Sequence, residues 1–100
     1  MKQKEAAVAH ALMRKDRSAK REIRVPCGRV DLVTPREIIE VKAVEQWKQG
    51  LGQVLAYGTH FPPAVKKRLH LFGNEADCVG GLPTAKRVCA QFGVKVTGPK

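Results

Sequence analysis

A hairpin predicted around a turn at residues 35–36 constrains the fold of this chain more than any other part of its sequence. Two β-rich runs, 28–34 and 37–42, flank that turn, which is typical of a pair of antiparallel strands. Side chains alternate between the two faces of a strand, so a symmetric turn places Asp31 directly opposite Glu40. Two carboxylates in a cross-strand pair repel each other, and we therefore expect a cation between them.

The composition indicates one globular domain whose partner is a polyanion. We expect residues 1–100 to form a single domain with one modest core, because 100 residues are too few for two. The 43% of hydrophobic and 28% of charged residues are typical of a globular protein and not of a disordered one. Nineteen Lys and Arg against nine Asp and Glu give a formal net charge of +10. This balance favours a polyanion as partner, most simply a nucleic acid, although a solubilising surface or a basic ribosome-associated protein would also have it.

Cysteine use and hydropathy predict an intracellular protein. The three cysteines form no CxxC pair and have no histidine at zinc-finger spacing, so reduced thiols are expected. No apolar run approaches the roughly 20 residues of a transmembrane helix, and the basic N-terminal segment lacks the apolar stretch of a signal peptide. We therefore expect a soluble protein of the cytoplasm or another intracellular compartment, without a membrane partner.

The order of the predicted elements indicates an α/β fold. Three consecutive strands would form a meander, and a helix would then cross over to a fourth strand, giving a mixed sheet with helices on its faces. A charged stretch between the first helix and the first strand is expected to be an exposed loop, either solvated or in contact with phosphates. In chain order, the expected elements are a helix at 1–14, a loop at 14–21, strands at 22–26, 28–34 and 37–42, a helix at 44–60, a strand at 67–73, a loop through Gly80-Gly81, a helix at 83–92 and an edge strand at 94–96.

The charged residues of the hairpin suit chemistry at a phosphodiester. Asp31 and Glu40 offer the hard oxygen ligands that Mg²⁺ or Mn²⁺ takes, and the carbonyl of Val41 could add a third. Lys42 lies two positions after Glu40, so its ammonium group shares a strand face with that carboxylate and could stabilise charge on the phosphate. The alternative is a set of ion pairs on a solvated face, which would contribute only about 0–1 kcal/mol each.

The helix that follows the hairpin carries two further candidates. Gln53 and Tyr57 are four positions apart and therefore share one helical face. Both side chains can donate hydrogen bonds to phosphate oxygens or hold a metal-bound water. Arg29 and Lys48 are expected to bind phosphates, which positions a nucleic acid without reading its sequence.

Together these residues resemble the PD-(D/E)XK nuclease superfamily. The motif Asp-x8-Glu-Val-Lys, followed by Gln-x-x-x-Tyr on the next helix, is similar to the RecB-like branch with its QxxxY element over roughly residues 5–73. The resemblance implies a restriction-endonuclease-like core, which is a mixed four-stranded sheet in αβββαβ order flanked by helices. A C-terminal helix and strand would be additions to that core. One departure is Val30, which stands where the superfamily name has proline.

The resemblance also implies a role for each candidate residue. Lys42 would be catalytic together with the two carboxylates, and Gln53 and Tyr57 would contact the substrate or the metal. An acid on the first helix often joins the metal ligands in this superfamily, and Glu5 is the matching position. The implied ligands of Mg²⁺ or Mn²⁺ are Asp31, Glu40, Val41 and Glu5.

We therefore expect a Mg²⁺-dependent deoxyribonuclease, with an endonuclease favoured, from a phage or mobile element. For a monomer, cleavage would be guided by DNA structure or be weakly specific, because a chain of this size has little surface for reading bases. The alternative is a non-catalytic, basic nucleic-acid-binding module on the same fold, with affinity that falls steeply with salt. A third interpretation is a basic structural protein. A homodimer or higher homo-oligomer is left open, since two sites would allow both strands to be cut.

Overall fold

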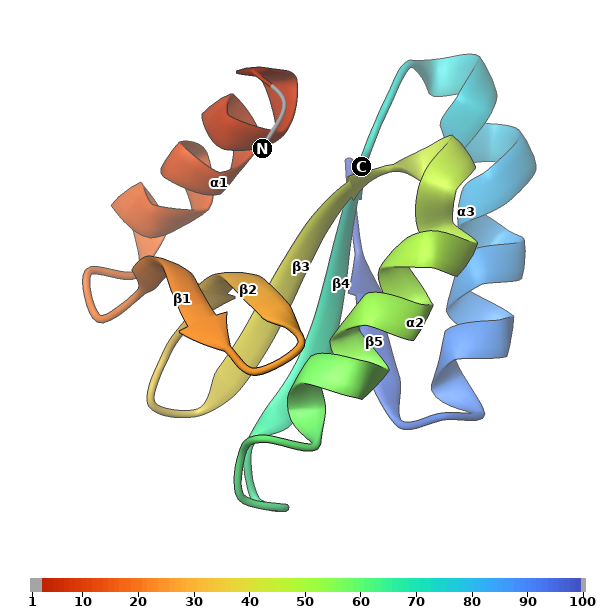
Figure 1. The fold of residues 1–100 in the computed structure, drawn as a ribbon. Helices are drawn as coiled ribbons and strands as arrows, with labels where there is room; N and C mark the ends of the chain where they lie inside the picture. Colours follow the sequence, from red (N-terminus) through yellow and green to blue (C-terminus); the bar gives the residue numbers. More distant parts are fainter. Residues whose placement is uncertain (1–2, 100) are drawn as a thin grey trace.

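The computed structural model describes residues 3–99 and has the predicted order of helices and strands (Figure 1). Five strands form one mixed sheet in the order β1-β2-β3-β4-β5. The first three strands pair antiparallel, and β4 and β5 continue the sheet in parallel. The elements are α1 (Gln3–Lys15), β1 (Lys20–Val25), β2 (Gly28–Val33), β3 (Glu37–Ala43), the 3₁₀ turn η1 (Val44–Gln46), α2 (Trp47–Gly58), β4 (Lys66–Phe72), α3 (Glu75–Ala90) and β5 (Val94–Thr97).

Helices cover both faces of the sheet, α1 on one side and α2 with α3 on the other (Figure 1). The central strand β3 is therefore apolar on both faces, and Ile38, Ile39 and Val41 are all at most 2% exposed. Such continuous apolar runs are typical of strands buried on both sides. The α1 side packs around Ala9, Leu32, Ile39 and Val41, and the larger α2–α3 side includes Val54, Leu69, Leu71, Ala85 and Cys89.

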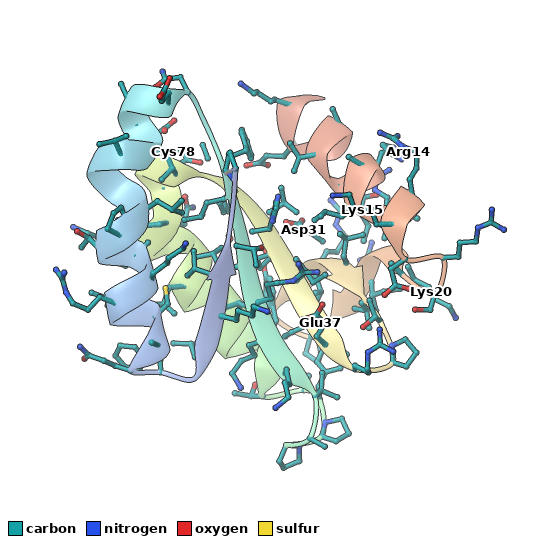
Figure 2. All side chains as sticks on the ribbon, turned by 180° about the vertical axis from the view of Figure 1, so that it is seen from behind. Arg14, Lys15, Lys20, Asp31, Glu37 and Cys78 are labelled. Atoms are coloured by element: carbon teal, nitrogen blue, oxygen red, sulfur yellow. The ribbon has the colours of Figure 1, made fainter. Side chains whose placement is uncertain are left out.

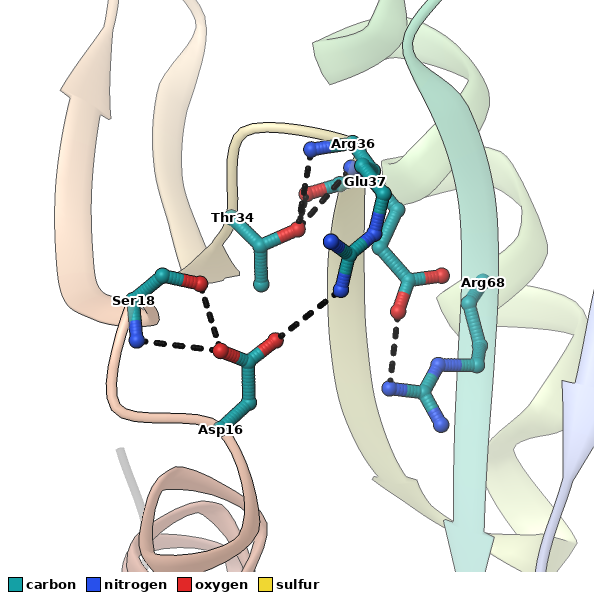
Figure 3. A network of polar contacts seen from close by, with 6 residues as sticks. All are labelled: Asp16, Ser18, Thr34, Arg36, Glu37 and Arg68. Atoms are coloured by element: carbon teal, nitrogen blue, oxygen red, sulfur yellow. Dashed lines mark hydrogen bonds and ion pairs between the residues drawn. The ribbon is translucent and has the colours of Figure 1, made fainter.

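The turn between β2 and β3 has the predicted register. Thr34 donates its backbone N–H to the Glu37 carbonyl at 2.9 Å, and its side-chain Oγ1 accepts from the N–H groups of Arg36 and Glu37. The Arg36 guanidinium lies 3.7 Å from Asp16 after α1, and Arg68 on β4 pairs with Glu37 at 2.9 Å (Figure 3). These contacts connect the turn to the segment after α1 and to β4, and they stabilise the register between β2 and β3.

The last helix begins earlier than the sequence predicts. It starts at Glu75 rather than near residue 83, because the Asn74 side chain accepts a hydrogen bond from the Asp77 N–H at 2.8 Å and caps the helix. The predicted loop through Gly80-Gly81 is helical. A Cβ at Gly81 would lie 3.2 Å from Val44 Cγ2, so a glycine there lets the helix pass close to η1.

The charged stretch 14–21 is also more regular than expected. It contains the end of α1 and the first residues of β1, and only residues 16–19 connect them.

In the part of the chain from residue 3 to residue 99, no helix combines the length and the apolar character needed to cross a membrane. The predicted compartment stays a prediction.

Candidate functional site

Most of the predicted site residues meet in a single pocket of about 290 Å³. The pocket receives side chains from α1, β1, β2, β3 and α2, so residues far apart in the sequence converge on it. Its charged and polar lining consists of Glu5, Glu22, Arg29, Asp31, Glu40, Lys42, Gln53 and Tyr57.

The pocket lies where the pairing between β2 and β3 gives way to side-chain hydrogen bonds. The backbones of the two strands pair at Leu32 and Ile39 but not at the next position, where Asp31 faces Glu40. There Glu40 Oε1 accepts a hydrogen bond from the Asp31 N–H at 3.1 Å, and Asp31 Oδ2 accepts one from the Val41 N–H at 2.8 Å. The two carboxylates therefore lie opposite each other, as predicted, and each binds the backbone of the other strand.

Burial of this carboxylate pair makes its negative charge costly. Glu40 is 2% exposed, and its burial, with the nearby charge of Asp31, raises its pKa to about 8. Burial likewise raises the pKa of Asp31, while the hydrogen bond from the Val41 N–H opposes that rise. Lys42 favours the charged form of both carboxylates. Without a further cation, Glu40 is thus mostly protonated at neutral pH.

A third acid approaches the pair from α1. Glu5 is 7% exposed, and its negative charge contributes to the raised pKa of Asp31. Glu5 therefore lies in the same pocket as the two carboxylates, and its role as a metal ligand stays a prediction.

Glu22 on β1 is a pocket residue that the sequence analysis missed. Its neighbours Arg21 and Ile23 pair with Leu32 and Val30 on β2, so Glu22 stands opposite Asp31. Its φ of +52° is the one positive φ of a residue other than glycine between residues 3 and 99, in a region that side chains with a Cβ rarely adopt. Pairing residues outward from the turn at 26–27, as was done for the hairpin between β2 and β3, would have placed Glu22 opposite Asp31.

The α2 side of the pocket holds Tyr57 and Gln53. A Cβ at Gly28 would lie 2.8 Å from the Tyr57 hydroxyl, and Gly28 has φ +153°, so a glycine is required where β2 meets this ring. Burial, reinforced by the charge of Glu40, raises the pKa of Tyr57. The Gln53 Oε1 atom is buried and has no hydrogen-bond partner among the described residues. It is therefore available to a donor on a bound group.

The remaining predicted residues differ in their positions. Lys42 lines the pocket, and Arg29 is exposed at its edge. The Val41 side chain lies in the core, as predicted, and its N–H contributes to the carboxylate pair. Lys48 is outside the pocket: its Nζ lies 5.9 Å from the centre of the Trp47 ring. The helical period turns Lys48 away from the face that carries Gln53, and its contact with a phosphate stays a prediction.

The fit of the pocket to a metal ion depends on two carboxylates. Among residues 3–99, no three His, Cys, Asp or Glu side chains are grouped closely enough to form a complete metal site. Asp31 and Glu40 nevertheless suit Mg²⁺, which usually takes one or two carboxylates and completes its shell with waters or phosphates. The unpartnered Gln53 Oε1 could accept a hydrogen bond from such a water.

Comparison with known proteins finds relatives in a giant virus. No family model matches the chain, and no solved structure matches it. Three proteins of Acanthamoeba polyphaga mimivirus are similar, each described as a putative KilA-N domain-containing protein. They are L33 (37% identical over 75 residues; 75% of this chain and 29% of the relative), R878 (29% over 91 residues; 91% and 24%) and L32 (33% over 84 residues; 84% and 22%). The chain thus spans about a quarter of the length of the relatives it matches.

These relatives change the functional interpretation. They are named for the KilA-N domain, a DNA-binding domain, and none of the three is named as a nuclease. The predicted metal-dependent deoxyribonuclease is therefore wrong, and the alternative, a non-catalytic nucleic-acid-binding module, is favoured. The resemblance to PD-(D/E)XK enzymes is limited to the motif residues and the order of the elements. The expected homo-oligomer stays a prediction.

Proposed function

We propose that this domain binds DNA without cleaving it, on a restriction-endonuclease-like core. The observation that carries the proposal is the division of charge between the pocket and the surface. Four of the nine acids, Glu5, Glu22, Asp31 and Glu40, line one pocket. Outside this pocket the sequence has five acids against seventeen Lys and Arg, so the positive excess lies on the rest of the domain, where it attracts a polyanion.

The corner between α1 and β1 is a cationic part of that surface. Arg14, Lys15 and Lys20 lie at the end of α1 and the start of β1 (Figure 2), and all three are exposed. Asp16, the acid of this corner, is engaged by Ser18 and Arg36. The names of the viral relatives support DNA as the polyanion that this corner contacts.

We predict that binding to a labelled DNA duplex, followed by fluorescence anisotropy, weakens steeply with salt. If four to six phosphates are contacted, affinity should fall roughly 10²–10³-fold between about 50 and 200 mM salt. Substituting Lys15 and Lys20 together by Gln should weaken binding and reduce the salt slope by about 2. The matched control is Lys86→Gln with Arg87→Gln on α3, which are also exposed and should bind as the wild type does.

The same samples, incubated with Mg²⁺ and resolved on a denaturing gel, test the absence of cleavage. Intact DNA is expected in every lane. Cleavage that is present in the wild type and lost in Asp31→Asn would overturn the non-catalytic part of the proposal. Binding that is absent, or equal in both pairs of variants, would overturn the part that assigns DNA binding to this surface.

We further propose that Mg²⁺ binds between Asp31 and Glu40 and connects the pocket to a DNA phosphate. The ion would offset the burial that raises the pKa of both carboxylates and the repulsion that Asp31 exerts on Glu40. Mg²⁺ commonly bridges carboxylates and phosphates. In this arrangement Lys42 and Arg29, on the pocket wall, would face the phosphate.

Thermal unfolding in the absence of DNA tests this cation site. Mg²⁺ at about 100 times its dissociation constant should stabilise the wild-type protein by about 2.7 kcal/mol. The effect should be larger at pH 8 than at pH 5, because protons compete with the ion for Glu40, whose pKa is raised to about 8. Asp31→Asn should lose the effect, whereas Glu45→Gln on η1 should retain it. Equal stabilisation of Asp31→Asn and the wild type would rule out the site.

A further inference from the structure

Two arginines stand directly opposite each other in the hairpin next to the acidic pocket. Arg24 on β1 pairs with Arg29 on β2, and residues paired in this way project their side chains from the same face of the sheet. Both side chains are exposed. Like charges placed opposite each other are unfavourable, so a third group of negative charge would stabilise the pair.

Among residues 3–99, no carboxylate forms an ion pair with Arg24 or Arg29, whereas Arg36 and Arg68 are each paired with one. The two opposed arginines instead line a cavity of about 700 Å³, and the other residues of its wall are Val25, Pro26 and Gly28. None of these wall residues carries a negative charge.

The cavity adjoins the acidic pocket through a shared residue. Arg29 lines both hollows, so a chain of phosphates could pass from one to the other. Guanidinium groups bind phosphate oxygens through pairs of parallel hydrogen bonds, and two guanidiniums from adjacent strands could contact one phosphate together.

We propose that Arg24 and Arg29 form a clamp for one phosphodiester group of the DNA backbone. The clamp rests on the proposed DNA binding and adds to it the point at which the backbone passes the pocket. It accounts for a like-charge pair that the domain does not neutralise itself. It also predicts that both arginines contact the same phosphate, so their contributions to DNA affinity are coupled.

A double-mutant cycle measured by DNA anisotropy tests this coupling. Arg24→Gln and Arg29→Gln should each weaken binding about 10-fold and reduce the salt slope by about 1. The double variant should be weakened about 20-fold to 30-fold, well short of the roughly 100-fold expected for independent contacts. Arg87→Gln on α3, an exposed arginine remote from the cavity, is the matched control and should leave both quantities unchanged.

A second measurement distinguishes DNA from free phosphate as the ligand. At equal ionic strength, replacing chloride by inorganic phosphate should raise the thermal midpoint of the wild type more than that of the double variant, because free phosphate can also bind between the two guanidiniums. The same midpoint, measured at low salt without DNA, should rise in either single variant because the repulsion is removed. Binding of inorganic phosphate at this pair, combined with unchanged DNA affinity in the variants, would overturn the assignment to DNA.

The outcomes separate the clamp from the proposed function. A wild-type protein that does not bind DNA would overturn both. Normal DNA binding with additive effects of the two substitutions, or with effects no larger than that of Arg87→Gln, would overturn the clamp alone.

Discussion

Glu40→Gln is expected to be more stable than the wild-type protein above pH 8, in the absence of divalent cations. The folded-state pKa of Glu40 is raised from 4.5 to about 8, so the folded protein binds more protons than the unfolded chain within that range. The free energy of unfolding must then fall as pH rises from about 4.5 to about 8. Glutamine keeps the acceptor for the Asp31 N–H and removes the buried charge, so the gain should be on the order of 3 kcal/mol.

Urea unfolding at a series of pH values measures this difference directly. The two proteins should have similar stabilities at about pH 3, well below the unfolded-state pKa of 4.5, where Glu40 is protonated in both the folded and the unfolded wild type. Glu45→Gln, a substitution of an exposed carboxylate on η1, should follow the wild-type curve. A constant difference between Glu40→Gln and the wild type at all pH values would show that the buried charge does not limit stability.

Two glycines of α2 should respond oppositely to the same substitution. A Cβ at Gly50 would lie 2.6 Å from Leu69 Cδ1 and 2.9 Å from Lys42 Cγ, whereas a Cβ at Gly52 would meet nothing within 4 Å. Leu69 is fully buried and has little room to move. We expect Gly50→Ala to destabilise the protein by about 1–3 kcal/mol, and Gly52→Ala to stabilise it by about 0.5–1 kcal/mol because alanine favours helices.

Each of these substitutions serves as the control for the other. Both add one methyl group to the same helix, so thermal or urea unfolding compares them without a change in charge. Gly50→Ala should also weaken the response to Mg²⁺, because α2 would shift relative to Lys42 and the carboxylate pair. Stabilisation by both substitutions would mean that α2 can move away from the sheet at no cost.

The parts of the fold that were predictable depend on local patterns. The register between β2 and β3 follows from a short turn and from alternation along two strands, so the sequence places Asp31 opposite Glu40. The start of α3 does not follow from local patterns. Gly80, Gly81 and Pro83 favour a loop there, yet packing against Val44 and the cap at Asn74 keep the segment helical.

The site residues that could be predicted are those for which a sequence motif agrees with the period of a strand or helix. Gln53 and Tyr57 share a helical face, and that face meets the carboxylates in the folded domain. Glu22 escaped notice because its position depends on the first hairpin and on a backbone conformation that no residue pattern signals. Lys48 lies outside the pocket because proximity in sequence to the site does not determine which side of α2 a residue occupies.

At one position between β2 and β3, carboxylate hydrogen bonds replace backbone pairing. The proposed binding groups therefore also hold the two strands together. The Asp31 and Val41 amides are held by the same oxygens that a cation would recruit. A ligand that draws those oxygens away loosens the seam between the strands, and a loosened seam presents the oxygens differently to the ligand. We therefore expect ligand binding at the carboxylates to change the rigidity of the β2–β3 pairing, and the hydrogen exchange of the Asp31 and Val41 amides to measure that change.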